Sequence, residues 1–374
     1  MIECDEFATA CQEVGFDFFT GVPDSTFKSW MSYLGRNDTD LTNVTTVNEC
    51  EATAVGAGYH LATGDIGVVY LQNDGLGKCV NPLTSLTNEE VYNIPLLLMI
   101  GWRSEPGIDD AVQHDKMGEI LLDLLELLDI PYQILPEDID EVRDVLQDAN
   151  AYMESEETPY AIIVRQDLFE PDTGGDIQGP GTLSREEAVK IAAEQLGGNE
   201  LVISTTGKLS RELYEHRKDS GDGLGNDFYN VGAMGCAQSI GLGAALGQPD
   251  RNLVVFDGDG SVLMQMGAMA TAGNWEPGNF HHVIFDNQAH ESTGGQATSS
   301  GAIHFEDIAK GCNYNSTNVV STEVDIRSAM DRDLSQSGPT LTVIKISRGV
   351  RSDLGRPTEP LTELKELFMK TAQS

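Results

Sequence analysis

Residues 252–266, NLVVFDGDGSVLMQM, join an apolar run to a turn that holds two carboxylates and two glycines. The apolar run predicts a strand buried on both faces, as in a parallel sheet, and a helix is expected to begin near Ser261. Gly258 and Gly260 let a ligand approach the backbone closely, and the start of a helix favours phosphate. Since a carboxylate repels phosphate, Asp259 indicates a bridging cation such as Mg²⁺.

Two other interpretations of this turn are excluded. Asp257, Asp259 and Ser261 have the spacing that opens an EF-hand calcium loop. That loop, however, requires glycine where this chain has Val262 and an acid where it has Ala268. A dinucleotide-binding fingerprint needs a third glycine, which GDGSVL lacks. Asp257, which alternates to the other side of the strand, is expected to be structural.

Apolar runs that end in turn or polar residues recur in both halves, for example YAIIVR in the first and ELVISTTG, HHVIFDN and PTLTVIKI in the second. We therefore predict an α/β protein with two doubly wound parallel-sheet domains and no central domain. The predicted domains are residues 1–170 and 183–374. Residues 171–182 are acidic and rich in Gly and Pro, and they are predicted to form the linker.

Local signals predict individual elements. Ser184 and Glu187 have the spacing of a capping box at the start of a helix, which is expected to end at Gly197. Residues 85–103 are expected to run from a helix into a buried strand that ends at Arg103. The ends of the parallel strands are where a ligand is expected to bind.

The charge is strongly unbalanced, because 60 Asp and Glu oppose 23 Lys and Arg to give a formal net charge of −37. Such a field repels nucleic acid and anionic membranes. No apolar run approaches the roughly 20 residues that span a bilayer, the start is not typical of a signal peptide, and the six cysteines include no CxxC pair. These features predict a cytoplasmic protein, and the acid excess predicts a halophilic source. An ordinary acidic enzyme is the alternative.

Asn287 follows Asp259 by about one strand–helix–strand unit, so both residues are expected to end adjacent parallel strands. A GDG followed at this distance by Asn resembles the signature of thiamine-diphosphate enzymes. The resemblance implies that Asp259, Asn287 and the backbone carbonyl of Ala289 hold Mg²⁺, which binds the diphosphate of the cofactor.

A second motif of that family lies in the first half. Residues 48–59, NECEATAVGAGY, resemble the pattern N-E-x-x-A-x-x-A-x-G-Y and place Glu49 where the family has its catalytic glutamate. The resemblance implies that this carboxyl binds a pyrimidine nitrogen of the cofactor and thereby promotes its deprotonation. Residues 73–82 resemble the glycine-rich loop, and residues 231–246 resemble the segment beneath the thiazolium. There Met234 would prop the cofactor, or would simply be a core methionine.

The resemblance also implies further cofactor and substrate contacts. The expected cofactor-binding residues are Gly75, Gly77, Gly207, Gly232, Met234, Gly235, Gly258, Gly260, Ser261 and Asn287. The expected substrate-binding residues are Asp24, Ser25, Asn73, Lys78, Arg103 and Gln113. Arg103 and then Lys78 are the preferred anion clamps, and Asp24 could instead cap a helix. His114 and His290 are candidates for proton transfer or anion contact, with a structural role as the alternative.

The stretches FTGVPDS, NPLTSL, IPLLLMIGWRSEPG, STTGKLSREL and HESTGGQAT resemble the compact phosphonopyruvate and sulfopyruvate decarboxylase family. The resemblance implies non-oxidative decarboxylation of phosphonopyruvate to phosphonoacetaldehyde and CO₂, in a homo-oligomer with active sites between subunits. Lys78 and Asp74 depart from the family's more usual Asn and Ser. Sulfopyruvate or another 2-oxo acid is therefore the alternative substrate. A catalytically idle cofactor-binding subunit and a nicotinamide dehydrogenase are weaker interpretations, because Glu49 is retained and GxGxxG is missing.

The net charge predicts that salt stabilises the protein. Raising salt from 0.1 M to 1 M shortens the screening length from about 10 Å to about 3 Å, which weakens the repulsion among the acidic side chains. We expect the melting temperature, followed by circular dichroism, to rise between low and molar KCl. A melting temperature that stays constant or falls would contradict a halophilic adaptation.

Overall fold

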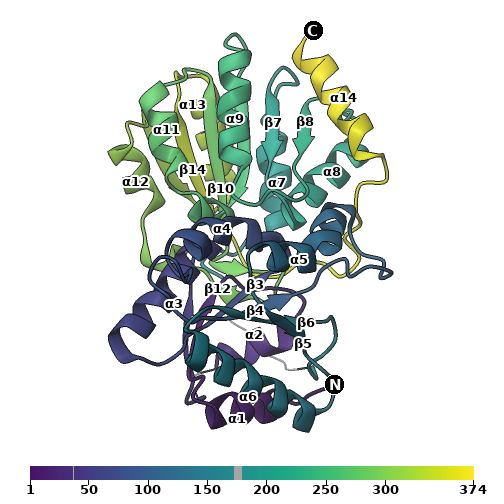
Figure 1. Ribbon diagram of the computed structural model, residues 1–374. Coiled ribbons are helices and arrows are strands. Elements are labelled where there is room, and N and C mark those ends of the chain that lie inside the picture. The colour runs from purple at the N-terminus through teal and green to yellow at the C-terminus, as the bar shows by residue number, and fades with distance from the viewer. Residues whose placement is uncertain (37, 172–178) are drawn as a thin grey trace. The chain divides into compact units, whose positions relative to one another are not determined.

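The computed structural model describes residues 1–36, 38–171 and 179–374, and the chain divides into two compact units (Figure 1). The first unit is Met1–Asp176 with Thr293–Gln296, and the second is Ile177–Ser292 with Ala297–Ser374. Most of the predicted linker, residues 172–178, lies outside the described residues, so the predicted domain limits stay predictions. Among the described residues, no helix combines the length and apolar character needed to cross a membrane.

The first unit is built on a six-stranded sheet in the order β2-β1-β3-β4-β6-β5, and all neighbouring strands are parallel. Its strands are β1 (Phe18–Gly21), β2 (Thr42–Thr45), β3 (Val68–Gln72), β4 (Leu97–Gly101), β5 (Tyr132–Ile134) and β6 (Tyr160–Val164). Two short 3₁₀ turns are present: η1 (Asn73–Gly75) directly after β3, and η2 (Val112–His114) between β4 and helix α5 (Asp115–Leu127).

Helices cover both faces of this sheet, as Figure 1 shows. One face packs against α1 (Cys4–Glu13), α2 (Lys28–Leu34) and α6 (Ile139–Glu156), and the other against α3 (Glu49–Thr63), α4 (Leu76–Ser85) and α5 (Asp115–Leu127). Within β3, Val68 and Tyr70 join the first core while Val69 and Leu71 join the second. Burial on both faces explains why the strand is apolar at successive positions.

The second unit holds another parallel six-stranded sheet, in the order β13-β14-β10-β9-β7-β8. Its strands are β7 (Leu201–Ser204), β8 (Asp227–Tyr229), β9 (Leu253–Gly258), β10 (Phe280–Asp286), β13 (Ser316–Val320) and β14 (Thr340–Lys345). The shorter elements are β11 (Ala289–His290), β12 (Gln296–Ala297) and η3 (Ser299–Ala302). The predicted α/β class with two parallel sheets is confirmed.

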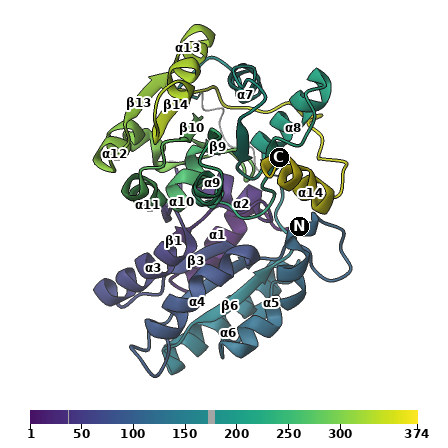
Figure 2. The ribbon, with the colours of Figure 1, turned by 90° about the horizontal axis from the view of Figure 1, so that it is seen from above.

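This second sheet is also covered on both faces (Figure 2). One face packs against α7 (Arg185–Ala193), α8 (Lys208–Ser220), α13 (Glu323–Leu334) and α14 (Leu361–Ala372), and the other side carries α9 (Ala237–Gly247), α11 (Ala268–Trp275) and α12 (Phe305–Gly311). Helix α10 (Asp259–Met264) directly follows β9. Gly241 lets α9 approach the sheet, because an added Cβ would lie 2.3 Å from Val255 Cγ2.

Several local predictions are confirmed. β9 and β10 are adjacent and parallel, so Asp259 and Asn287 do follow neighbouring strands. Ser184 accepts a hydrogen bond from the Glu187 N–H, and the Glu187 side chain accepts one from the Ser184 N–H, which completes the capping box. Asp257 is fully buried and its Oδ2 lies 3.6 Å from His282 Nε2, in keeping with a structural role.

Other boundaries were predicted wrongly. Helix α4 ends at Ser85, the first residue of the stretch expected to run from a helix into a strand, and residues 86–93 are not helical. Here the Asn88 side chain accepts a hydrogen bond from Glu90 N at 3.0 Å, a local bond that favours a turn over a helix.

Three element ends are offset from the predicted residues. β4 ends at Gly101, two residues before Arg103. Helix α10 begins at Asp259, two residues before Ser261, and is six residues long. Helix α7 ends at Ala193, before Gly197. Such offsets arise because the pattern of apolar residues does not mark where the last backbone hydrogen bond forms.

His281 generates a testable pH dependence. Burial lowers its pKa from 6.5 to about 4, so between these values the unfolded chain binds a proton that the folded chain does not. Stability is therefore complete above pH 6.5 and falls as the pH drops toward 4, by about 1.4 kcal/mol per pH unit and at most about 3 kcal/mol.

Urea unfolding of the parent and of His281→Gln at several pH values measures this contribution. The parent should lose stability on acidification more steeply than the variant. An exposed histidine, His304, supplies the control variant His304→Gln, which should follow the parent. Parallel pH profiles for the parent and His281→Gln would contradict the assignment.

Candidate active site

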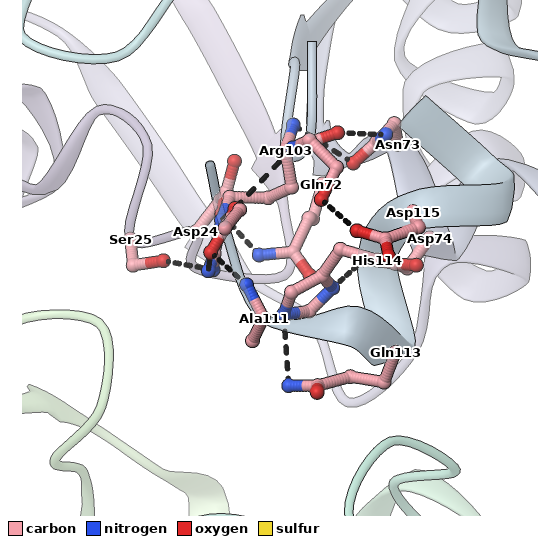
Figure 3. Close-up of polar contacts among 12 residues, drawn as sticks. Asp24, Ser25, Gln72, Asn73, Asp74, Arg103, Ala111, Gln113, His114 and Asp115 are labelled. Atoms are coloured by element: carbon pink, nitrogen blue, oxygen red, sulfur yellow. Dashed lines mark hydrogen bonds and ion pairs between the residues drawn. The ribbon is translucent and has the colours of Figure 1, made fainter. Parts of the chain in front are cut away.

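The predicted residues of the first unit gather beyond the carboxyl ends of its parallel strands, where such sheets bind ligands. Asp24 and Ser25 follow β1, Glu49 opens α3 after β2, Asn73 to Lys78 follow β3, and Arg103 follows β4. Figure 3 draws Asp24, Ser25, Asn73, Arg103 and His114 close together in separate sets of polar contacts: Asp24 with Gln72, Arg103 with Ser25 and Asn73, and His114 with Asp74.

Glu49 is buried at the first position of α3, and the Asn48 side chain caps this helix by accepting a hydrogen bond from Glu51 N. Glu49 Oε2 lies 3.2 Å from Lys78 Nζ but accepts no hydrogen bond from the described residues. A Cβ added to Gly75 would lie 2.4 Å from Glu49 Oε1. Glycine at position 75 therefore makes the room that this carboxyl occupies.

Arg103 is held by an internal carboxylate. Its Nε donates to Asp110 Oδ2 at 2.6 Å, its Nη2 donates to Asp110 Oδ1 at 2.5 Å, and its Nη1 donates to Ser25 Oγ at 2.9 Å. Burial would raise the pKa of Asp110, but hydrogen bonds from Arg103, Ala111 N and Ser104 N outweigh it and lower that pKa. Since Asp110 already balances the guanidinium, the role of Arg103 as an anion clamp stays a prediction.

Asp24 is fully buried, and burial raises its pKa despite hydrogen bonds to Oδ1 from Gln72 Nε2 at 2.6 Å and from Thr26 N at 3.2 Å. Its Oδ2 accepts no hydrogen bond from the described residues and packs on Gly101, where a Cβ would lie 1.8 Å away. The alternative that Asp24 caps a helix is wrong, because α2 begins only at Lys28 and has no side-chain cap.

Asn73 contacts the backbone of Arg103. Its Nδ2 donates to the Arg103 carbonyl at 2.9 Å, and its Oδ1 accepts from Arg103 N at 3.2 Å. This pair of bonds ties the segment after β3 to the segment after β4. The predicted contact of Asn73 with substrate stays a prediction, since its amide is engaged within the protein.

His114 is held between two side chains (Figure 3). Its Nδ1 forms a short hydrogen bond with Asp74 Oδ2, and its Nε2 lies 3.2 Å from Gln113 Nε2. Because a carboxylate only accepts and an amide nitrogen only donates, Nδ1 carries the proton and Nε2 accepts. His114 is thus oriented as a base whose proton-carrying nitrogen is fixed by Asp74.

In the second unit, Asp259 is buried at the start of α10. Its Oδ2 accepts a short hydrogen bond from Thr298 Oγ1 and lies 3.0 Å from Ser300 Oγ, which is also 2.9 Å from Asp286 Oδ1. Burial and then the charge of Asp286 raise the pKa of Asp259 to about 6. Lys345 Nζ forms an ion pair with Asp286 Oδ2 and balances part of this negative charge.

Asn287 follows β10 in a sharp turn. Its Oδ1 accepts from Ala289 N at 3.0 Å, and the intervening Gln288 has a φ of +58°. Within the described ranges no group of three or more His, Cys, Asp or Glu side chains is placed to hold a metal. The Mg²⁺ ligand set expected here contains only one carboxylate, in Asp259, so it stays a prediction that this finding does not test.

Ser261 connects three of the turns expected to contact the cofactor. Its Oγ accepts from Thr205 Oγ1, after β7, at 2.8 Å and from Gly235 N, before α9, at 3.1 Å. Gly207 and Gly235 have φ of +90° and +86°, a region that favours glycine. These contacts bring the segments of the predicted cofactor site together at one edge of the second sheet.

The remaining predicted residues follow the carboxyl ends of the strands in the two sheets. A Cβ at Gly260 would lie 3.0 Å from His290 Cε1, and burial lowers the pKa of His290 to about 4, so it is neutral near pH 7. Met234 is half-buried, and its N–H donates to Gly232 O at 2.9 Å. Gly77 lies in α4 with nothing within 4 Å of an added Cβ.

Sequence reasoning did not predict which residues hold these side chains: Gln72, Asp74, Asp110, Asp286, Thr298, Ser300 and Lys345. Thr298 closes the stretch HESTGGQAT, so its motif was visible but its contact with Asp259 was not. Asp110 lies in a loop without periodicity and gave no signal. Asp74 was visible as a departure from the family's usual serine.

Comparison with known proteins defines the class. The family model described as "Thiamine pyrophosphate enzyme, N-terminal TPP binding domain" matches residues 5–127, and "Thiamine pyrophosphate enzyme, C-terminal TPP binding domain" matches residues 205–344. The first match lies in the first unit, and the second lies in the second unit except for Thr293–Gln296. The chain therefore belongs to the thiamine pyrophosphate enzymes, as its two motifs predicted.

Curated relatives narrow this class. The chain is 36% identical to a phosphonopyruvate decarboxylase of Streptomyces viridochromogenes, over 98% of this chain and 94% of that protein. It is 35% identical to a phosphonopyruvate decarboxylase of Streptomyces hygroscopicus, over 100% of this chain and 94% of that protein. A sulfopyruvate decarboxylase of Methanosarcina acetivorans is 27% identical over 85% of this chain and 84% of its own length.

The contact between Gly75 and Glu49 generates a prediction. A methyl group in Gly75→Ala would displace the Glu49 carboxyl, while the backbone at residue 75 has a φ of −77° that alanine tolerates. We expect thiamine diphosphate affinity to fall by about tenfold or more, or about 1.4 kcal/mol or more, with little loss of thermal stability.

Isothermal calorimetry of cofactor binding measures the change. Gly58→Ala is the matched control, because Gly58 lies in the same helix as Glu49 and an added Cβ would have nothing within 4 Å. Equal cofactor affinity for the parent and both variants would show that this close contact does not position Glu49.

Proposed function

We propose that the protein is a thiamine-diphosphate-dependent decarboxylase that converts phosphonopyruvate to phosphonoacetaldehyde and CO₂. The observation that carries this proposal is the Glu49 carboxyl, which is buried on Gly75 and leaves Oε2 without a hydrogen bond from the described residues. The substrate follows from similarity to two phosphonopyruvate decarboxylases over nearly the whole chain.

The residues present fit the cofactor. A buried carboxylate oxygen that accepts no hydrogen bond costs free energy, and a ring nitrogen of the cofactor's pyrimidine would satisfy Glu49. When bound, thiamine diphosphate supplies the electron sink that decarboxylation of a 2-oxo acid requires. Glu49 would hold a proton at its carboxyl against that ring, and the 3.2 Å contact with Lys78 would stabilise the carboxylate after the proton moves.

We further propose that Asp259, Asn287 and the carbonyl of Ala289 hold Mg²⁺. Oxygen ligands of this kind suit Mg²⁺. Thr298 and Ser300 support the proposal because both contact Oδ2 of Asp259 and so fix the orientation of its carboxylate. Ser261 holds the two neighbouring turns in place through its bonds with Thr205 and Gly235.

Proton transfer to the product carbon is assigned to residues already oriented for it. Asp24, whose pKa is raised by burial, is suited to hold a proton. His114 has its Nδ1 proton fixed by Asp74, which leaves Nε2 to exchange protons. His290 is neutral near pH 7 and is the third candidate. As in the family that the motifs resemble, we propose a homo-oligomer with active sites between subunits.

Sulfopyruvate decarboxylation is the second candidate function, because the chain is also similar to a sulfopyruvate decarboxylase over most of its length. A sulfonate carries one negative charge and a phosphonate up to two. The two substrates therefore demand different amounts of positive charge from the protein, and steady-state kinetics with both separates the two functions.

Product analysis tests the proposal. The protein is incubated in molar KCl with thiamine diphosphate and Mg²⁺, and with phosphonopyruvate, sulfopyruvate or pyruvate, while CO₂ and aldehyde are measured. Phosphonopyruvate should give the highest kcat/KM. Glu49→Gln should lower kcat by about 100-fold or more, because an amide cannot exchange the proton.

Glu51→Gln is the matched control, because Glu51 is exposed in the first turn of the same helix. It should retain the activity of the parent. A Glu49→Gln variant that turns over as fast as the parent would exclude the proposed mechanism, and a higher kcat/KM with sulfopyruvate would favour the second function.

A further inference from the structure

Positively charged side chains are scarce in this chain. Nearly every Lys or Arg that is at least half-buried forms an ion pair or hydrogen bond. All 23 Lys and Arg lie within the described residues, against 60 Asp and Glu. Lys208 and Arg211 are half-buried, yet neither forms an ion pair or hydrogen bond with any described residue. The other Lys and Arg without such a partner are exposed: Lys28, Lys190, Arg356, Lys365 and Lys370.

The two cations share one face of a helix. Lys208 is the first residue of α8 and Arg211 lies three positions later, a spacing that places both side chains on the same side. Gly207 precedes the helix, has a φ of +90°, and provides no side-chain cap for the first N–H groups. The positive end of the helix dipole therefore adds to the charge of both side chains.

The two carboxylates whose charge acts on Lys208, those of Glu212 and Glu291, are already bound to other partners. Glu212 accepts two hydrogen bonds from Arg185, at 2.8 and 2.9 Å, and Glu291 accepts one from Gly349 N at 3.1 Å. Burial, and then the charges of Arg211 and Arg185, lower the pKa of Lys208.

Arg211 is likewise partly buried and is repelled by another cation, Arg356. Burial and then the charge of Arg356 lower its pKa. Two partly desolvated cations that repel each other cost free energy, and a bound anion would remove that cost.

This cationic face adjoins the candidate active site within the second unit. Thr205, three residues before Lys208, donates to Ser261 at 2.8 Å, and Ser261 lies two residues after Asp259. A Cβ at Gly207 would lie 3.6 Å from Ser292 Oγ, in the segment that follows His290. The start of α8 is therefore at the same sheet edge as the predicted cofactor and metal ligands.

The earlier candidates for an anion clamp are less suited to this role. Arg103 donates to Asp110 through Nε and Nη2 and to Ser25 through Nη1, and Lys78 Nζ lies 3.2 Å from Glu49 Oε2. An incoming dianion would have to displace a carboxylate from either of them. Lys208 and Arg211 form no ion pair with a described residue that an anion would have to displace.

We propose that Lys208 and Arg211 form the binding site for the dianionic phosphonate of the substrate. The inference rests on the proposed function and names the part of the substrate that this surface recognises. Two adjacent cations suit a phosphorus oxyanion, whose three oxygens accept charge-assisted hydrogen bonds. The diphosphate of the cofactor has the same chemistry, so the test must separate substrate from cofactor.

The test uses the full-length protein loaded with thiamine diphosphate and Mg²⁺, at the lowest KCl concentration that keeps it folded, because salt screens these contacts. Calorimetry measures binding of phosphonoacetate, which carries the phosphonate but no ketone. Separate titrations of the apoprotein measure thiamine diphosphate affinity. The variants are Lys208→Gln and Arg211→Gln, with Lys208→Arg as the charge-retaining variant and Lys365→Gln as an exposed control of equal charge change.

The expected result is that each neutral variant weakens phosphonoacetate binding and raises the KM for phosphonopyruvate by about 10- to 100-fold. The KM for pyruvate, which lacks the phosphonate, and the affinity for thiamine diphosphate should not change. Lys208→Arg should recover most of the affinity, and Lys365→Gln should match the parent.

Three outcomes would overturn the inference: no binding of phosphonoacetate by the parent, unchanged binding in both neutral variants, or a loss confined to thiamine diphosphate affinity. The last would assign these cations to the diphosphate of the cofactor. Failure of the proposed function is distinguishable. In that case the parent would release no CO₂ from phosphonopyruvate, although phosphonoacetate would still bind through Lys208 and Arg211.

Discussion

Parallel strand pairing is the constraint on which the sites depend. In each unit, six parallel strands end at one edge of the sheet, so residues far apart in the sequence meet there. In the first unit this edge collects Asp24, Glu49 and Arg103, each after a different strand. In the second it collects Asp259 and Asn287 after neighbouring strands. The apolar cores on both faces of each sheet hold these strand ends in position.

Buried charge at these edges is organised by specific partners. Asp110 neutralises Arg103, Asp74 orients His114, and Lys345 balances Asp286 beside Asp259. Burial otherwise raises the pKa of carboxyl groups and lowers that of cations. In a chain of net charge −37, a half-buried cation without an acidic partner is therefore unusual, and it indicates where an anion can bind.

Close backbone packing is the second organising feature. Gly75 and Gly101 leave room for the carboxyl groups of Glu49 and Asp24, since a Cβ at either glycine would overlap them. The motifs identified Glu49 and the glycine-rich segment that carries Gly75, but not the contact between them. The same holds for Asp259, whose motif was visible while its hydroxyl partners, Thr298 and Ser300, were not. Contacts between distant segments leave no periodic trace in a sequence.

The sequence by itself determined the α/β class, the two parallel sheets, the family and the adjacency of Asp259 and Asn287. It did so because burial on both faces produces continuous apolar runs, and because the motifs lie in short contiguous segments. Only the tertiary structure decided which charges are paired. Ion pairing depends on where loops without periodicity, such as the one carrying Asp110, fold back onto a strand end. For the same reason, the sequence favoured Arg103 as an anion clamp, whereas the structure pairs Arg103 and leaves Lys208 and Arg211 without acidic partners among the described residues.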